Sequence, residues 1–246
     1  MGDFNIYPAY AIMVLLGFAL MLMFPTTRGL TSSSEKQSYW ILQGISLFAA
    51  LLGAKFAVVM GDGLWPLQPF DNWQGLLTSG RSIVGALLFG FIGAEIAKPL
   101  LNYQLPPNDR FAMLLPFSLG IGRIGCLLTG CSRGLPWDGM FAITYADGIP
   151  RHPAQIYDML FNFALGFIFI ALYRRKLLHG RLFALYLVCY GIFRFISEFW
   201  RETIKAFAGF SAYQWLCVVM VIVGIITLAI RSYRPPPPWG AAGENI

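Results

Sequence analysis

The sequence predicts an all-α polytopic membrane protein with seven transmembrane helices. Of its 246 residues, 57% are hydrophobic and 12% are charged, whereas ordinary soluble domains carry about 25% charged residues. Apolar runs recur along the chain, and each approaches the roughly 20 residues that a helix needs to cross about 30 Å of hydrocarbon. The predicted spans are 8–25, 39–60, 82–101, 111–130, 154–173, 181–200 and 212–230.

Two segments between the spans are long, 61–81 and 131–153. Both are rich in Trp, Pro, Gly and Asp, which is typical of interfacial loops. The run at 8–25 has no basic residue before it and no cleavage-site pattern after it, so it is predicted to be a retained span. Residues 1–234 are therefore predicted to form a single membrane domain, and 235–246 a proline-rich tail.

Lys and Arg are divided unequally between the two sides of the predicted bundle. One side carries ten: Arg28, Lys36, Lys98, Arg110, Arg174, Arg175, Lys176, Arg181, Arg231 and Arg234. The other carries five: Arg81, Arg133, Arg151, Arg201 and Lys205. Basic residues are in excess in cytoplasmic loops, so the N-terminus is predicted outside and the C-terminus in the cytoplasm. The net charge of +6 then reflects topology rather than a surface for nucleic acid.

Four charged residues lie inside or at the edge of the predicted spans, near their outer ends. Arg123 belongs to the fourth span, and Arg194, Glu198 and Arg201 to the sixth, at the spacing i, i+4, i+7 of one helix face. A guanidinium in a bilayer costs about 2.5–3.5 kcal/mol on insertion scales, so such residues are typical of functional sites. Glu198 is expected to hold one arginine and leave the other available to an anion, which arginine binds with a planar fork of donors.

Other residues are expected at the same membrane depth. Arg81 begins the third span, Asp158 lies in the first turns of the fifth, and Lys55 lies in the last turns of the second. Gly122 and Gly125 flank Arg123 and allow a lipid headgroup or another helix to approach the backbone closely.

Three segments resemble the ordered signature of prolipoprotein diacylglyceryl transferases: Gly-Arg-Ile-Gly-Cys-Leu-Leu-Thr-Gly at 122–130, His-Pro-Ala-Gln-Ile-Tyr-Asp at 152–158 and Phe-Arg-Phe-Ile-Ser-Glu-Phe-Trp-Arg at 193–201. Gln214-Trp215 is also similar to that family. The resemblance implies seven spans in the bacterial cytoplasmic (inner) membrane, with an active site toward the outer leaflet. It implies transfer of a diacylglyceryl group from phosphatidylglycerol to the lipobox cysteine thiol of a secreted preprotein, with release of glycerol phosphate and without a cofactor or metal.

Carried over by motif position, Arg123 and Arg194 are the catalytic, phosphate-binding arginines, and Glu198 and Arg201 complete the cluster. The chain departs from the family pattern at two places. Cys126, Thr129 and Cys131 stand where the motif has Asn, Asn and Glu. Val84 stands where the family has a histidine that is a candidate thiol base, and His152 is the candidate to replace it.

Two further functions remain open on the sequence. One is a related membrane transferase that uses phosphatidylglycerol with another acceptor. The other is a non-catalytic protein that binds or transports an anionic lipid. The two halves of the chain show no convincing repeat, which favours an enzyme over a transporter.

Several of these residues have a structural alternative. Arg123 is alternatively interpreted as a structural partner of Glu198 or Asp158, and the polar residues of the sixth span as an ion-paired helix end, although the order of the motifs favours function. His152 is interpretable as a capping or packing residue. Gln155, Tyr157 and Asp158 are predicted either to anchor the fifth span at the interface or to bind a glycerol hydroxyl.

Cys126 and Cys131 are five residues apart, which fits neither a CxxC redox motif nor a zinc site. Three interpretations stay open for them. They are packed free thiols, a disulfide formed at an oxidising exterior if the helix ends near Thr129, or a nucleophile activated by a nearby arginine.

Overall fold

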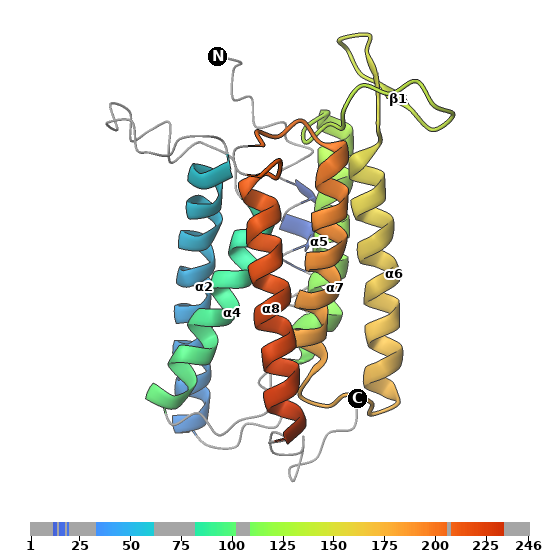
Figure 1. Ribbon diagram of the computed structural model, residues 1–246. Helices are drawn as coiled ribbons and strands as arrows, with labels where there is room; N and C mark the ends of the chain where they lie inside the picture. The colour runs from blue at the N-terminus through green and yellow to red at the C-terminus, as the bar shows by residue number, and fades with distance from the viewer. Residues whose placement is uncertain are drawn as a thin grey trace. The chain divides into compact units, whose positions relative to one another are not determined.

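The computed structural model describes residues 12–13, 15–17, 19, 33–61, 82–101, 109–205 and 208–233. The chain divides into two compact units. Figure 1 labels their helices. The first unit comprises Met1–Thr26, Asn108–Phe183 and Phe199–Glu202. The second unit comprises Thr27–Pro107, Ala184–Glu198 and Thr203–Ile246.

Six helices in the described part of the chain are long and apolar enough to cross a membrane, so this is a polytopic membrane protein. They are α2 (Ser33–Gly61), α4 (Ile83–Leu100), α5 (Asp109–Thr129), α6 (Ala154–Arg174), α7 (Leu182–Ser197), which continues as the 3₁₀-helix η1 (Glu198–Trp200), and α8 (Ala212–Tyr233). They match the second to seventh predicted spans. Most of the first predicted span and the whole of the tail lie outside the described residues.

The predicted boundaries agree with the helices to within a few residues, except at the start of α2. This helix begins at Ser33, whereas the predicted span began at 39. The prediction started too late because the first turns of the helix are polar and carry Glu35. A search for apolar runs misses such turns, although a carboxylate in the first turn stabilises a helix N-terminus.

Helices α2 and α4 of the second unit pack backbone against backbone where two glycines meet. A Cβ added to Gly85 would lie 2.1 Å from the carbonyl oxygen of Gly53 and 2.6 Å from the Cβ of Ala57. Small residues at a crossing let helices in a membrane approach closely enough for extensive van der Waals contact. Ser46 adds a hydrogen bond across the same pair of helices, from its hydroxyl to the Gly90 carbonyl at 2.9 Å.

Gly85→Ala is expected to destabilise the protein by about 1–3 kcal/mol, because the methyl group has no space unless the helices separate. Gly44→Ala in α2 is the matched control, since an added Cβ there meets no atom within 4 Å. The apparent melting temperature in detergent should fall for the first variant and not for the second. Equal melting temperatures would contradict the close helix crossing.

Helix α8 of the second unit packs against α7 through small residues and against α4 through charge. An added Cβ at Gly191 would lie 2.7 Å from Val221, and one at Gly224 would lie 2.7 Å from Val188. Near the other end of α8, Arg231 pairs with Glu95 of α4 at 2.8 Å. Glu95 also pairs with Lys98. Glu95 therefore has a structural role, because it joins α4 to α8.

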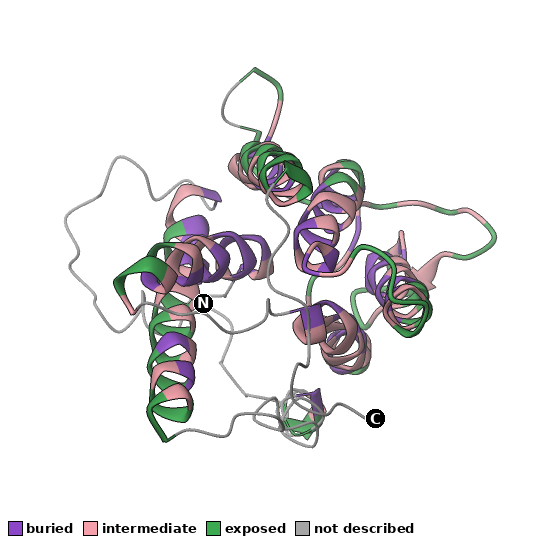
Figure 2. Ribbon diagram, turned by 90° about the horizontal axis from the view of Figure 1, so that it is seen from below, coloured by how far each residue is buried: buried purple, intermediate pink, exposed green. Residues whose placement is uncertain are grey.

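Helices α5 and α6 of the first unit interlock through two glycines and two phenylalanines. An added Cβ at Gly120 would lie 2.7 Å from the ring of Phe163, and one at Gly166 would lie 2.6 Å from the ring of Phe117. Exposed and buried residues alternate around the helices (Figure 2). On α6 the exposed residues include large apolar side chains such as Phe167, as expected for a surface that contacts lipid.

The N-terminus of α5 is joined to the start of α7 through Asp109, which is fully buried. Its carboxylate accepts hydrogen bonds from the backbone N–H of Gly180 and, at 3.1 Å, from that of Leu182. One side chain thus satisfies two backbone donors that would otherwise be buried without partners.

The predicted interfacial loop 131–153 contains a short antiparallel hairpin, which the all-α prediction did not include. Strand β1 (Ile143–Thr144) pairs with β2 (Pro150–Arg151) in the register Ile143 to Arg151. Two isolated bridges extend this pairing, Pro136 with Arg151 and Gly134 with Arg201. Strands of two residues are too short for an alternating apolar pattern to reveal them.

Candidate active site

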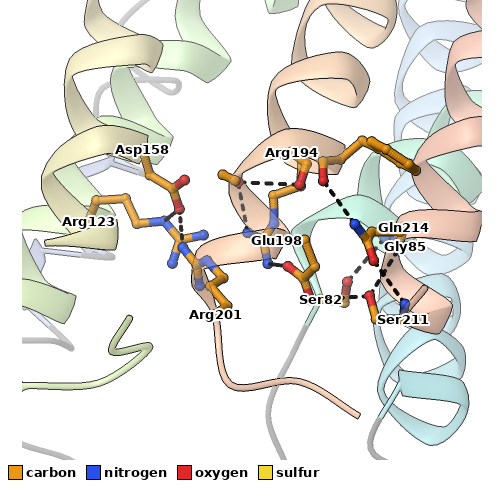
Figure 3. Close-up of polar contacts among 11 residues, drawn as sticks. Ser82, Gly85, Arg123, Asp158, Arg194, Glu198, Arg201, Ser211 and Gln214 are labelled. Carbon is orange, nitrogen blue, oxygen red and sulfur yellow. Dashed lines mark hydrogen bonds and ion pairs between the residues drawn. The ribbon is translucent and has the colours of Figure 1, made fainter. Parts of the chain in front are cut away.

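The first unit contains a buried cluster of two arginines and one aspartate, which we call the arginine cluster: Arg123 of α5, Asp158 of α6 and Arg201, directly after η1 (Figure 3). The Arg123 Nε lies 2.8 Å from Asp158 Oδ2, and Arg201 Nη2 lies 2.6 Å from the same oxygen. The three side chains are 10% or less exposed. The pairing of Arg123 with Asp158 is the one that the structural alternative predicted.

The arginine cluster carries an excess positive charge, because two guanidiniums and one carboxylate sum to +1. Buried charges are costly unless they are compensated, and an anion that contacts both guanidiniums would lower the cost of burying them. A phosphodiester carries a single negative charge and accepts the same kind of forked hydrogen bond as a carboxylate. The charge of the cluster is therefore complementary to that of an anionic lipid headgroup.

The backbone of the loop 131–153 holds Arg201 in place. Besides the bridge between Gly134 and Arg201, the Leu135 N–H donates to the Trp200 carbonyl at 2.8 Å. On the other side of this segment, the His152 N–H donates to the Leu135 carbonyl at 3.0 Å. An added Cβ at Gly134 would lie only 2.4 Å from the His152 carbonyl oxygen, so a glycine is needed where these segments stack.

His152, the predicted base, lies in an aromatic cluster of the first unit. Its ring stacks on Trp137 with centroids 4.3 Å apart and an interplanar angle of 3°. Its Nδ1 lies 3.5 Å from the hydroxyl of Tyr157, and Trp200 makes a tilted contact at 6.2 Å. The packing fixes the ring and leaves it partly exposed, so the geometry is compatible with either interpretation of this residue.

Gln155 was predicted to bind substrate. It is fully buried, and both its amide oxygen and its amide nitrogen are hydrogen bonded to other residues of the protein. Its Oε1 accepts from the Tyr145 hydroxyl at 3.0 Å, and its Nε2 donates to the Cys131 carbonyl at 2.6 Å. Gln155 therefore ties the loop to the start of α6. Burial in this contact raises the pKa of Tyr145, which keeps the hydroxyl protonated as a donor.

A second buried cluster lies in the second unit and contains Arg194 and Glu198. Arg194 Nη2 lies 2.7 Å from Glu198 Oε2, and Arg194 Nη1 donates to the Ser197 hydroxyl at 3.1 Å. The charges of this pair cancel. Arg194, Glu198 and Arg201 do not share one α-helical face as predicted, because α7 ends at Ser197 and the 3₁₀-helix η1 follows. Glu198 thus holds Arg194, while Arg201 binds Asp158 rather than Glu198.

Ser211 supports Glu198, and the sequence reasoning missed it. Its hydroxyl donates to Glu198 Oε1 at 3.4 Å and accepts from the Gln214 N–H at 3.2 Å. The Gln214 Oε1 in turn accepts from the Ser211 N–H at 2.9 Å. This is a capping box at the start of α8 (Figure 3), for which Ser-x-x-Gln before an apolar run is a recognised sequence signal.

The remaining predicted site residues are placed as follows. Gly122 and Gly125 lie in α5, where an added Cβ at Gly122 would meet no atom within 4 Å. Lys55 lies half-buried in α2. Arg81 lies outside the described residues.

Cys126 and Cys131 are free thiols. Across the described ranges, no group of three or more His, Cys, Asp or Glu side chains is arranged to hold a metal ion.

Residues 1–230 match the family model described as prolipoprotein diacylglyceryl transferase. The chain belongs to this family of transferases. A curated phosphatidylglycerol–prolipoprotein diacylglyceryl transferase from Nitrosospira multiformis is 32% identical over 96% of this chain and 86% of its own length. Relatives with the same name from Polynucleobacter asymbioticus and Paracidovorax citrulli are each 34% identical, over 94% and 92% of both chains.

In this member of the prolipoprotein diacylglyceryl transferase family, the three motif segments lie in or next to helices that the structure describes. The glycine-arginine motif forms the end of α5, the His-Pro motif leads into α6, and the third motif closes α7 and η1. Val84, at the histidine position of the family pattern, lies in α4 and is 1% exposed. A valine supplies no titratable group, so a base for thiol chemistry must come from elsewhere.

Proposed function

We propose that this protein transfers the diacylglyceryl group of phosphatidylglycerol to the lipobox cysteine thiol of a secreted preprotein, and releases glycerol phosphate. Membership of the family supports the reaction, and the arginine cluster supports the site. The observation that carries the assignment is the pairing of Arg123 and Arg201 on one oxygen of Asp158, which holds two buried guanidiniums side by side.

The proposed reaction forms one bond and breaks one. The thiolate of the acceptor cysteine attacks the glycerol carbon of the diacylglyceryl group, a thioether forms, and the carbon–oxygen bond to phosphate breaks. The bonding electrons pass to the phosphate oxygen, so the charge of the phosphate group rises from one negative charge toward two. Guanidiniums fixed beside this oxygen stabilise the transition state more than the bound lipid, which is the condition for catalysis.

The other predicted site residues have supporting roles in this proposal. Arg123 contacts phosphate, and Asp158 positions its guanidinium. Arg194, which Glu198 holds, stays a predicted phosphate-binding residue on its motif position alone. His152 accepts the thiol proton directly or through water, because an imidazole nitrogen can serve as a general base. Tyr157 and Gln155 support the loop and the glycerol end of the site, whereas Lys55 and Arg81 stay predicted substrate-binding residues on sequence position alone.

We propose seven spans with the N-terminus outside and the C-terminus in the cytoplasm, as the ten-to-five division of Lys and Arg predicts. The membrane domain then comprises residues 1–234 and contains both compact units. The protein lies in the bacterial inner membrane, with its site toward the outer leaflet, where a secreted preprotein presents its cysteine.

Gly122→Ala is expected to have opposite effects on the stability of the protein and on its turnover of phosphatidylglycerol. Alanine in a helix interior is expected to stabilise the protein by about 0.5–1 kcal/mol relative to glycine, since the new methyl group meets open space. The same methyl group narrows the approach to Arg123, so the turnover of phosphatidylglycerol should fall by about tenfold. Melting temperature and initial rate are the two measurements, and an unchanged rate would remove Gly122 from the site.

The decisive experiment uses purified full-length protein in vesicles that contain phosphatidylglycerol labelled in its headgroup glycerol. A synthetic lipobox peptide is added, with a peptide carrying serine in place of the cysteine as the matched control. The proposal predicts labelled glycerol phosphate and a peptide whose mass has increased by one diacylglyceryl group. Neither product should form with the serine peptide.

Other outcomes select the alternatives. Release of glycerol phosphate with a membrane extract, but without modification of the peptide, would indicate a different acceptor. Co-purification of phosphatidylglycerol without release under any condition would indicate a lipid-binding or transport protein. Either result would overturn the proposed acceptor or the proposed reaction.

A further inference from the structure

The C-terminus of α5 brings two cysteines together by a defined helix-ending motif. The Cys131 N–H donates to the Cys126 carbonyl at 3.0 Å, and the Gly130 N–H donates to the Leu127 carbonyl at 3.3 Å. Gly130 has a φ of +68°. These are the two hydrogen bonds and the left-handed residue of a Schellman motif, in which the side chains at the positions of Cys126 and Cys131 normally touch.

In this protein the touching side chains are both thiols. The backbones of Cys126 and Cys131 are hydrogen bonded across the turn, and both thiols are free. Further contacts fix the turn. Gln155 donates to the Cys131 carbonyl at 2.6 Å, and Arg133 Nε donates to the Gly130 carbonyl at 2.7 Å. These contacts fix the turn that brings the two cysteines to adjacent positions.

A positive charge lies beside the two thiols. Arg123 Nη1 donates to Cys126 Sγ at 4.0 Å. The hydrogen bond from Cys126 and the nearby Arg123 guanidinium lower the pKa of the Cys131 thiol to about 6. Cys126 is buried, whereas Cys131 is only partly buried. An accessible thiolate next to a second thiol is the arrangement that reacts with disulfides.

We propose that Cys126 and Cys131 form a redox-active dithiol, a modification site that reacts with an external disulfide and closes reversibly into an intramolecular disulfide across the end of α5. Cys131 is the attacking thiol because it is the more accessible of the two. Cys126 is the resolving thiol. The co-reactant is a small-molecule or protein disulfide.

The exchange balances in two steps. The Cys131 thiolate attacks one sulfur of the donor disulfide, a mixed disulfide forms, and one donor thiolate leaves. Cys126 then loses its proton and attacks the sulfur of Cys131, and the second donor thiolate leaves. The two cysteines lose two electrons and two protons, and the donor disulfide is reduced to two thiols.

The test treats the full-length protein in lipid vesicles with oxidised glutathione, then labels the remaining thiols with N-ethylmaleimide after denaturation and maps them by mass spectrometry. The expected result is loss of label from Cys126 and Cys131 together, with an intramolecular cross-link and recovery on addition of dithiothreitol. Cys189 and Cys217, which lie in α7 and α8, should stay labelled and serve as internal controls. Retention of label on both Cys126 and Cys131 would overturn the proposal.

Two variants test the assigned roles. Cys126→Ser should stop at the mixed disulfide between Cys131 and glutathione, because the resolving thiol is absent. Arg123→Ala should slow the loss of the Cys131 thiol at neutral pH by about threefold or more, since the thiolate is less stabilised. Arg175→Ala, an exposed arginine at the end of α6, is the control. An intramolecular cross-link in Cys126→Ser, or an equal rate in Arg123→Ala, would contradict these roles. Every readout is a thiol measurement, so it decides the dithiol whether or not the transferase reaction is found.

Discussion

Arg123→Ala is expected to lower the turnover of phosphatidylglycerol by about 10²–10³-fold, the usual effect of removing one fixed donor from a site where negative charge develops. The change removes the excess charge of the arginine cluster, because Arg201 and Asp158 then sum to zero. Release of labelled glycerol phosphate from vesicles measures the loss. Most of the effect should lie in the chemical step, since the phosphate gains charge as the carbon–oxygen bond breaks.

Two variants make this result interpretable. Arg123→Lys keeps the charge and loses the fork, so it should recover only part of the activity. Arg175→Ala removes an exposed arginine from the end of α6 and should leave the rate unchanged. Full activity in Arg123→Ala, with the protein folded, would show that the cluster is an ion-paired helix contact and not the site.

Asp158→Ala is expected to give the largest loss of stability, about 3–5 kcal/mol, as when one partner of a buried ion pair is removed. Asp158 is 1% exposed and accepts from both Arg123 and Arg201. Its removal leaves two buried guanidiniums that repel each other. The measurement is the apparent melting temperature in detergent, together with the yield of folded protein.

Asp147→Ala provides the comparison within the same unit. Asp147 also binds two arginines, Arg133 at 2.9 Å and Arg151 at 3.3 Å, but it lies on the exposed loop. Exposed ion pairs contribute little because water and salt screen them, so this variant should melt like the unmodified protein. Equal losses in the two variants would mean that burial does not set the strength of the Asp158 contacts.

The sequence was sufficient to predict six of the helices, because a membrane span is a property of composition and length. Charged residues in apolar runs are conspicuous. The sequence therefore also identified the charged residues of the predicted spans, Arg123, Asp158, Arg194, Glu198 and Arg201. It did not determine which charges pair. Arg201 was expected on the face of Glu198, and the change from α-helix to 3₁₀-helix at Glu198 breaks that spacing.

Features made by short segments were beyond sequence reasoning for a different reason. The contacts of Gly134 with His152 and of Leu135 with Trp200 join residues far apart in the chain through backbone atoms. Backbone contacts leave no side-chain pattern to find. Ser211 was a different case, because the capping box was present in the sequence and only needed to be looked for.

The tether at Asp109 has a consequence for how the protein is made. Its two backbone donors, at Gly180 and Leu182, are synthesised 71 and 73 residues after it. During biogenesis the carboxylate must therefore stay hydrated at the membrane surface until α6 has been inserted and α7 has begun. Closure of this tether transfers the carboxylate from water to two backbone donors and joins the start of α5 to the start of α7.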